Sequence, residues 1–225
     1  MNSLADSSVN RSMRLVYDLH GICFSNGELI DYVSESLIIM GVYCQDIALH
    51  CIRVSNYSTL IGKQLRLPAR DINLLWCASI FHDIGKTDIP ADILEKPAKL
   101  TKEEYEIVKT HSLRGYELLR KNVHMGEVAN IMLHHHERFD GKGYPTGKEG
   151  QDIPFLSRII AVADAFDAMT TERAYKTVIS LDSALTELNN GKWTQFDGDV
   201  VDCFLDLIKD DCLKPKEQNM VLGLY

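Results

Sequence analysis

Residues 69–86 have the sequence ARDINLLWCASIFHDIGK, and this stretch decides the fold. Its first part is apolar on most faces of a helix, so we expect a central helix from Ala69 to about Asp83. The helix ends in the adjacent residues His82 and Asp83, and Gly85 then ends or bends it. Burying an imidazole beside a carboxylate costs free energy unless the two bind a partner, and a metal ion would be such a partner. The stretch therefore predicts a helical protein with a metal-binding pair at the end of its central helix.

Helical spacing continues on both sides of this stretch. Apolar residues at 46–65 recur with a helical period and stop before a proline. Residues 86–100 should be mostly loop, and Thr101 to Glu104 form a capping box at the start of a helix that carries His111. Further helices are expected at Glu127 to about His136, Pro154 to about Thr171, Ser180 to Asn189 and Asp199 to Lys209, with an ordered loop at 140–145. Since we find no convincing pair of strands, the predicted class is all-α.

The composition is that of a globular protein with room for a large core. The chain has 225 residues, of which 45% are hydrophobic and 25% charged. Its six cysteines are scattered without a CxxC pair, which predicts reduced thiols and a cytoplasmic location. The apolar stretch at 37–43 is far shorter than the ~20 residues of a membrane span. A net charge of −8 argues against a nucleic acid polymer as partner, although a small anion could bind through locally positive groups such as metal ions.

Other histidines and aspartates extend the candidate metal site. Asp46 and His50 lie one helical turn apart, so they either bind one ion together or form an exposed pair. Residues 134–136 are consecutive histidines, which in a helix would point about 100° apart, so one of them should be a bystander. Asp164 lies in an otherwise apolar helix and needs a cation, either a metal or Arg158 in a buried salt bridge.

Two of these stretches resemble signatures of the HD-GYP phosphodiesterases. His82 to Lys86 (HDIGK) is similar to their HDxGK element, and His135 to Pro145 (HHERFDGKGYP) matches HHExxDGxGYP. The resemblance covers roughly His50 to Val201 and includes DAFDAMT at residues 164–170. It implies a helical bundle of the HD superfamily with a di- or trinuclear metal site in its core.

The resemblance also implies a division of the chain. Residues 1–45 would be an N-terminal helical extension, 46–215 the HD-GYP catalytic domain, and 216–225 a C-terminal tail. Two positions depart from the family, because Ala174 and Gly198 stand where it usually has proline. Neither departure touches a residue that the resemblance makes a ligand.

The ligands that the resemblance implies are histidines and aspartates throughout. Members of the family with three metals have a glutamate where this chain has the shorter Asp46, so a third ion depends on that residue. Asp83 would bridge two ions, and His134 would be the bystander. The cofactors are expected to be two or three divalent ions, most readily iron or manganese. The expected ligands are Asp46, His50, His82, Asp83, His111, His135, His136 and Asp164.

The activity that the resemblance implies is hydrolysis of a cyclic dinucleotide, either cyclic di-GMP or 3′3′-cyclic GMP-AMP, to the linear dinucleotide in bacterial signalling. A metal-bridging hydroxide would attack the phosphorus, with Asp83 and Lys86 as the catalytic residues. Lys86, Arg173 and Lys176 would contact the phosphates, and the loop with Gly143 and Tyr144 would shape the substrate groove.

Other functions remain open at this point. An HD hydrolase of another nucleotide would not need the HHExxDGxGYP stretch, which argues against it. A cyclic dinucleotide sensor with weak or no catalysis would tolerate a degraded metal site, yet all the principal ligands are present. The sequence leaves open whether the protein forms a homodimer or binds a signalling partner.

Overall fold

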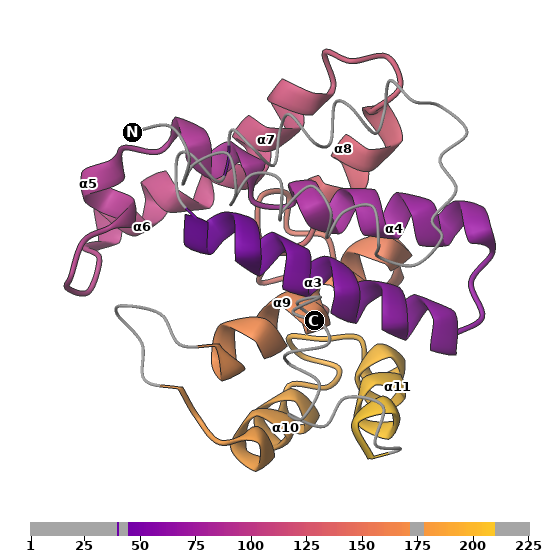
Figure 1. The fold of residues 1–225 in the computed structure, drawn as a ribbon. Coiled ribbons are helices and arrows are strands. Elements are labelled where there is room, and N and C mark those ends of the chain that lie inside the picture. Colours follow the sequence, from indigo (N-terminus) through magenta and orange to yellow (C-terminus); the bar gives the residue numbers. More distant parts are fainter. Residues whose placement is uncertain (1–39, 41–44, 172–177, 210–225) are drawn as a thin grey trace, which may run out of the picture.

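The computed structural model describes residues 40, 45–171 and 178–209 of the chain, and its described part is built from helices (Figure 1). Apart from one isolated bridge between Lys192 and Phe196, these residues contain no β-structure, so the all-α prediction is confirmed. The elements are α3 (Gln45–Gln64), α4 (Ala69–Phe81), η1 (Ile84–Asp88), α5 (Ala91–Leu94), α6 (Lys102–Lys109), α7 (His111–Leu119), α8 (Gly126–Leu133), η2 (Gly150–Asp152), α9 (Phe155–Thr170), α10 (Leu181–Asn190) and α11 (Gly198–Lys209).

Helix α4 lies at the centre, as its apolar sequence predicts. It packs between α3 and α8, and α3 also packs along α9 (Figure 1). The side chains of Leu75, Ile80 and Phe81 on α4 are fully buried. Removing such apolar surface from water is the main force that holds a bundle of this kind together. Helices α10 and α11 close the bundle beside α9 and α3.

The chain after α4 is pressed against the start of α7. A Cβ atom at Gly85 would lie 1.9 Å from the carbonyl oxygen of His111 and 2.5 Å from the amide nitrogen of Gly115. No side chain fits in that space, so glycine is required for η1 to approach α7 this closely. The approach sets Asp83, just before η1, beside His111.

The expected helix through His111 is in fact two helices. α6 begins with the predicted capping box, in which the Thr101 hydroxyl accepts from the Glu104 amide, but it ends at Lys109. The Thr110 amide and hydroxyl both donate to the Ile107 carbonyl, which tightens the chain and interrupts the helix. His111 therefore starts α7 instead of lying inside a longer helix.

Two other boundaries differ from the prediction. α8 ends at Leu133, because the His134 and His135 amides bond to carbonyls three residues back, and the three histidines follow in a turn. Residues 86–100, expected to be mostly loop, include most of η1 and the short α5. The expectations for residues 1–39, 41–44 and 210–225, including the C-terminal tail, and those for Arg173, Ala174 and Lys176 lie outside the described residues.

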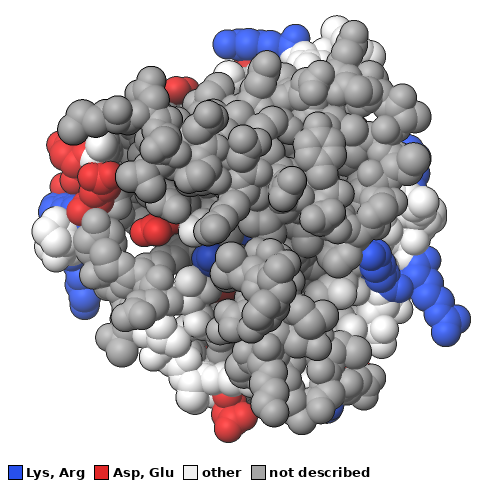
Figure 2. All heavy atoms as spheres, in the orientation of Figure 1, with Lys and Arg blue, Asp and Glu red and all other residues white. Residues whose placement is uncertain are grey.

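Two features concern a membrane and a nucleic acid as partners, namely the length of the helices and the charge of the surface. Among the described residues, none of the helices is both long and apolar enough to cross a membrane. On the face in Figure 2, the described Lys, Arg, Asp and Glu side chains lie in scattered groups without a broad basic surface among them.

Candidate metal centre

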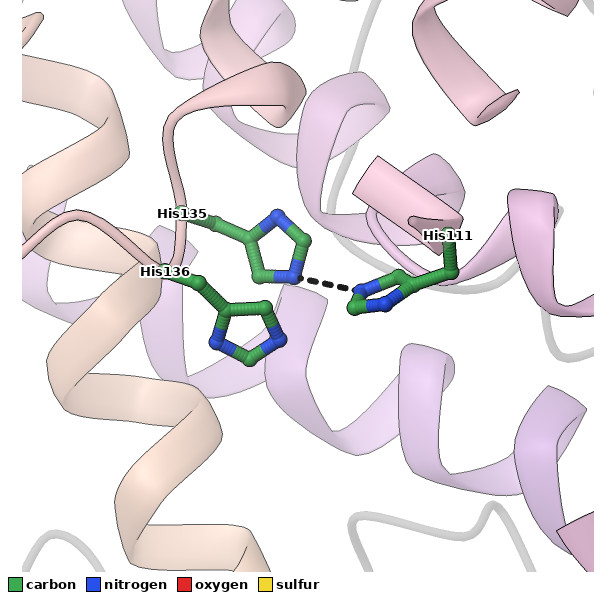
Figure 3. A group of neighbouring side chains, drawn as sticks. All are labelled: His111, His135 and His136. Carbon is green, nitrogen blue, oxygen red and sulfur yellow. Dashed lines mark hydrogen bonds between the residues drawn. The ribbon is translucent and has the colours of Figure 1, made fainter. Parts of the chain in front are cut away.

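The ends of α4, α7 and α8 and the interior of two further helices meet at one buried cluster. His82 is the C-cap of α4, Asp83 follows it, His111 opens α7, and His135 and His136 follow α8. Helices α3 and α9 contribute His50 and Asp164. Figure 3 shows the rings of His111, His135 and His136 lying close together and directed into the same space.

The cluster consists of two groups of ligand atoms. The ligand atoms of His50, His82 and Asp164 all lie within 4.8 Å of one another, and so do those of His111, His135 and His136. Within the first group, His50 Nε2 is 3.3 Å from His82 Nε2 and 3.1 Å from Asp164 Oδ1. Ligand atoms that each lie ~2.1 Å from one ion are roughly 3 Å apart, so both groups have the spacing of a metal site.

Asp83 lies between the two groups. Its Oδ2 is 3.7 Å from His50 Nε2 and 3.6 Å from His82 Nε2, whereas its Oδ1 is 3.4 Å from His111 Nε2. Each carboxylate oxygen therefore faces one group, which is the arrangement that a bridging ligand requires.

Backbone carbonyls fix the tautomers of three of the histidines. Nδ1 of His82, His111 and His135 donates to the carbonyl of Ser79, Val108 and Met132 at 2.7, 2.7 and 2.5 Å. Burial lowers the pKa of all three imidazoles, to about 4 for His111 and His135. These rings are neutral at pH 7 with their Nε2 lone pairs free to bind a cation.

The spacing of His111 and His135 tests whether this donor set fits a metal. Their Nε2 atoms face each other at 3.3 Å, and neither carries a proton because both rings are protonated at Nδ1. Two facing lone pairs repel unless a cation lies against both. The donors are imidazole nitrogens and carboxylate oxygens, a set that suits divalent first-row metals.

The carboxylates of the cluster are ionised despite burial. Burial alone would raise the pKa of Asp83, but the nearby Lys86 and histidines outweigh it and hold that pKa well below its ordinary value. Lys86 Nζ donates to Asp83 Oδ2 at 2.6 Å. Burial opposes ionisation of Asp164 too, and the hydrogen bond with His50 together with the neighbouring histidines holds its pKa low. Arg158, the alternative partner of Asp164, pairs instead with Asp197.

Asp46, an expected ligand, and His134, the expected bystander, both lie outside the two groups of ligand atoms. Asp46 is exposed and belongs to none of the candidate metal-binding groups among the described residues. His134 also lies outside them, and its Nδ1 is 3.5 Å from Glu137 Oε1. Glu137 in turn accepts from the Thr146 amide and hydroxyl, both at 2.7 Å, and so holds the following loop.

The loop after the histidines forms a wall of the cluster. The Tyr144 ring lies 4.8 Å from that of His136, and its amide donates to the His136 carbonyl. Lys109 Nζ lies 5.3 Å from the centre of the same tyrosine ring. A Cβ atom at Gly143 would lie 2.3 Å from the Arg138 nitrogen, so this glycine lets the loop approach its own backbone.

Sequence reasoning missed two residues behind the metal ligands and one beside them. Asp167 accepts a hydrogen bond from His50 Nδ1 at 2.6 Å, and Arg53 donates to both of its oxygens. Cys51 Sγ lies within 4.8 Å of ligand atoms of His82 and Asp83, and burial raises the pKa of this thiol well above its ordinary value. The available signal for Asp167 was a second aspartate, three residues after Asp164, in an apolar helix.

The fold and the paired histidine–aspartate cluster define the class. The chain belongs to the HD domain family, whose model matches residues 33–200. The likeness to the HD-GYP phosphodiesterases that the motifs predict is confirmed by curated relatives. The response regulator RpfG of Xanthomonas campestris, named a cyclic di-GMP phosphodiesterase, is 42% identical over 155 residues, which are 68% of this chain and 41% of the relative.

Two further relatives have the same kind of name. A cyclic di-GMP phosphodiesterase of Thermotoga maritima is 37% identical, and the match covers 81% of this chain and 51% of the relative. The 3′3′-cGAMP-specific phosphodiesterase 3 of Vibrio cholerae is 37% identical, with 76% of this chain and 37% of the relative covered. The chain thus spans about half the length of these relatives or less.

Solved structures share the fold. An HDG"Y"P protein from Bdellovibrio bacteriovorus has a TM-score of 0.63 at 20% identity and covers 91% of this chain and 63% of its own. A cyclic GMP-AMP phosphodiesterase of Vibrio cholerae (V-cGAP3) has a TM-score of 0.57 at 21% identity, with 76% of this chain and 45% of its own covered.

Proposed function

We propose that this chain is a metal-dependent phosphodiesterase that opens a cyclic dinucleotide, either cyclic di-GMP or 3′3′-cyclic GMP-AMP, to the linear dinucleotide. The observation that carries the proposal is Asp83, whose two oxygens face two separate groups of ligand atoms. The names of the relatives support the substrate class, since both dinucleotides occur among them.

The ligand residues fall into two groups, one for each proposed metal position. His50, His82 and Asp164 would hold one ion, His111, His135 and His136 the other, and Asp83 would bridge them. The donors suit divalent first-row metals in general, and the motif resemblance favours iron or manganese among them. Two such ions supply an activated water nucleophile and neutralise charge on the phosphate. A third ion would depend on Asp46.

The cations of the chain would orient the substrate. Lys86 Nζ pairs with Asp83 and is partly exposed, so it can exchange this contact for a nonbridging phosphate oxygen when metals occupy the carboxylate. Arg173 and Lys176 would contact the phosphates as the motif resemblance implies. Tyr144 presents an aromatic face beside His136, where it can exclude water from the reacting phosphate.

For the location and the assembly of the protein, the proposal keeps the expectations drawn from the sequence. The described cysteines Cys51, Cys77 and Cys203 are free thiols, which supports a cytoplasmic protein. We leave the choice between a homodimer and a separate signalling partner to a measurement of mass in solution.

The test is a cleavage assay on the metal-loaded chain. Metal content is measured on the purified protein, which is then incubated with cyclic di-GMP, 3′3′-cyclic GMP-AMP and cyclic di-AMP. Linear product from at least one of the first two is expected, together with loss of at least ~10³-fold of the rate in Asp83→Ala. Glu117→Ala, an exposed carboxylate on α7, is the control that should keep the rate.

The alternatives give different results. Binding of a dinucleotide without product from the metal-loaded chain would make it a sensor and overturn the proposal. Cleavage of an ordinary nucleotide in place of the cyclic substrates would assign it to another class of HD hydrolase.

A further inference from the structure

His50 is held differently from the other ligand histidines whose second nitrogen has an observed partner. Nδ1 of His82, His111 and His135 donates to a neutral backbone carbonyl three residues earlier in the chain. Nδ1 of His50 instead donates to the carboxylate of Asp167, which lies on α9, 117 residues further along the chain. The orientation of His50 therefore depends on how α9 packs against α3.

Asp167 has no exposed surface, and both of its carboxylate oxygens accept hydrogen bonds. Its Oδ2 accepts from His50 Nδ1 at 2.6 Å and from Arg53 Nη2 at 3.0 Å. Its Oδ1 accepts from Arg53 Nε at 2.6 Å and from the Thr171 hydroxyl at 3.0 Å. The forked contact with Arg53 compensates the cost of burying the charge and fixes the plane of the carboxylate.

We propose that Asp167, braced by Arg53, is the positioning residue that fixes the proton of His50 on Nδ1 and so directs its Nε2 lone pair at one metal position. This inference rests on the proposed metal centre. A carboxylate behind a ligand histidine orients the ring and makes it a stronger donor, and its loss usually weakens metal binding by ~10–100-fold. Among the described residues, the position formed by His50, His82 and Asp164 thus has a carboxylate behind one of its histidines, whereas His111 and His135 at the other position have backbone carbonyls.

The contacts predict what an isosteric change would do. In Asp167→Asn, the amide oxygen would stay at the Oδ1 position, because there it keeps the shorter of the two Arg53 contacts, 2.6 Å from Nε against 3.0 Å from Nη2, and the Thr171 hydroxyl. The NH₂ group would then face His50 Nδ1 and donate to it. Since a neutral imidazole carries one proton, that proton would move to Nε2, and the lone pair that binds the metal would be lost.

The experiment compares Asp167→Asn with Asp197→Asn in the full chain. Asp197 is a matched control because it is also a buried aspartate paired with an arginine, Arg158, and it caps the first turn of α11 instead of contacting a ligand histidine. Asp167→Asn should lower the bound metal by about half and weaken manganese binding at that position ~10–100-fold. Asp197→Asn should keep the wild-type metal content even where it lowers stability.

A second readout needs no activity. ¹⁵N shifts of the histidine rings in the metal-free wild type, recorded at a pH where His50 is neutral, should show the proton on Nδ1, because Asp167 lies 2.6 Å from Nδ1 whereas Asp164 lies 3.1 Å from Nε2. Asp167→Asn should show it on Nε2. Nε2–H in the wild type, or full metal content and unchanged affinity in Asp167→Asn, would overturn the proposal and leave Asp167 as a counter-ion of Arg53. If the chain binds metals but cleaves no dinucleotide, the proposed function fails while these two readouts still decide the role of Asp167.

Discussion

At the scale of single residues, the site is defined by which nitrogen of each imidazole already donates a hydrogen bond. His111 and His135 donate through Nδ1 to carbonyls, so their Nε2 atoms meet as two lone pairs. Such an arrangement carries unfavourable electrostatic energy in the metal-free protein and becomes favourable once a cation binds. The stability of the fold should therefore depend on metal and on pH together.

The pH dependence of the metal-free protein follows from these two histidines. Their pKa values are about 4 in the folded state against an ordinary value of 6.5, because burial disfavours the charged ring. As pH falls below 6.5, the unfolded chain takes up protons first, so the free energy of unfolding falls until about pH 4. We expect a loss of about 3 kcal/mol for each histidine across this window.

Urea unfolding of the metal-free chain at pH 7.5 and pH 4.5 measures this loss. His111→Gln removes one of the two groups and should reduce the pH dependence. A free energy of unfolding that stays constant between these pH values would contradict the assignment of buried neutral rings.

At the scale of elements, the close contact between η1 and α7 brings the two halves of the site together. Gly85→Ala would place a methyl group against the His111 carbonyl, and neither backbone segment can yield without moving Asp83 away from His111. We expect a loss of about 3 kcal/mol or more of stability and a loss of bound metal. Gly126→Ala is the control, because a Cβ there meets nothing within 4 Å. Unchanged metal content in Gly85→Ala would contradict this role of the contact.

A second pair of residues explains one departure from the family pattern. Trp193 has a φ of 60°, and its indole ring packs on Gly198, where a Cβ would lie 2.2 Å from a ring carbon. A proline or alanine at position 198 would collide with this ring. The ring also meets Phe139 of the loop edge to face, with centroids 5.5 Å apart, so the pair supports that loop.

The coupling of Trp193 and Gly198 is measurable by a double-mutant cycle. Gly198→Ala alone should cost about 1–3 kcal/mol through the collision with the indole. In a Trp193→Gly background the same change should cost little, because the ring is gone and the positive φ suits glycine. Equal costs in both backgrounds, from chemical unfolding curves, would contradict the coupling.

The sequence could predict most of the helices and the types of the metal ligands. Apolar periodicity placed α3, α4, α9 and α11 nearly to the residue, and the motifs brought the ligand histidines together. The break at Thr110 was missed because it depends on a hydroxyl that competes for a carbonyl. Asp164 and Asp167 look alike in sequence, and only the rotation of α9 against α3 makes one face the ligands and the other lie behind His50.

At the scale of the whole molecule, the bundle holds ligands from five parts of the chain around the Asp83 carboxylate. Helices α3, α4 and α9 supply one group, while α7 and the turn after α8 supply the other. Because α3, α8 and α9 pack on α4 while α7 packs on α8 and η1, the site forms only when the bundle is complete. Metal binding should thus be coupled to folding of the domain as a unit.

Anomalous diffraction from crystals of the manganese-loaded chain tests the central claim most directly. We expect two peaks ~3.5–4 Å apart, on either side of the Asp83 carboxylate, one against His50, His82 and Asp164 and one against His111, His135 and His136. A third peak beside Asp46 would extend the centre to three ions. A single peak, or ions that do not share Asp83, would contradict the two-metal account.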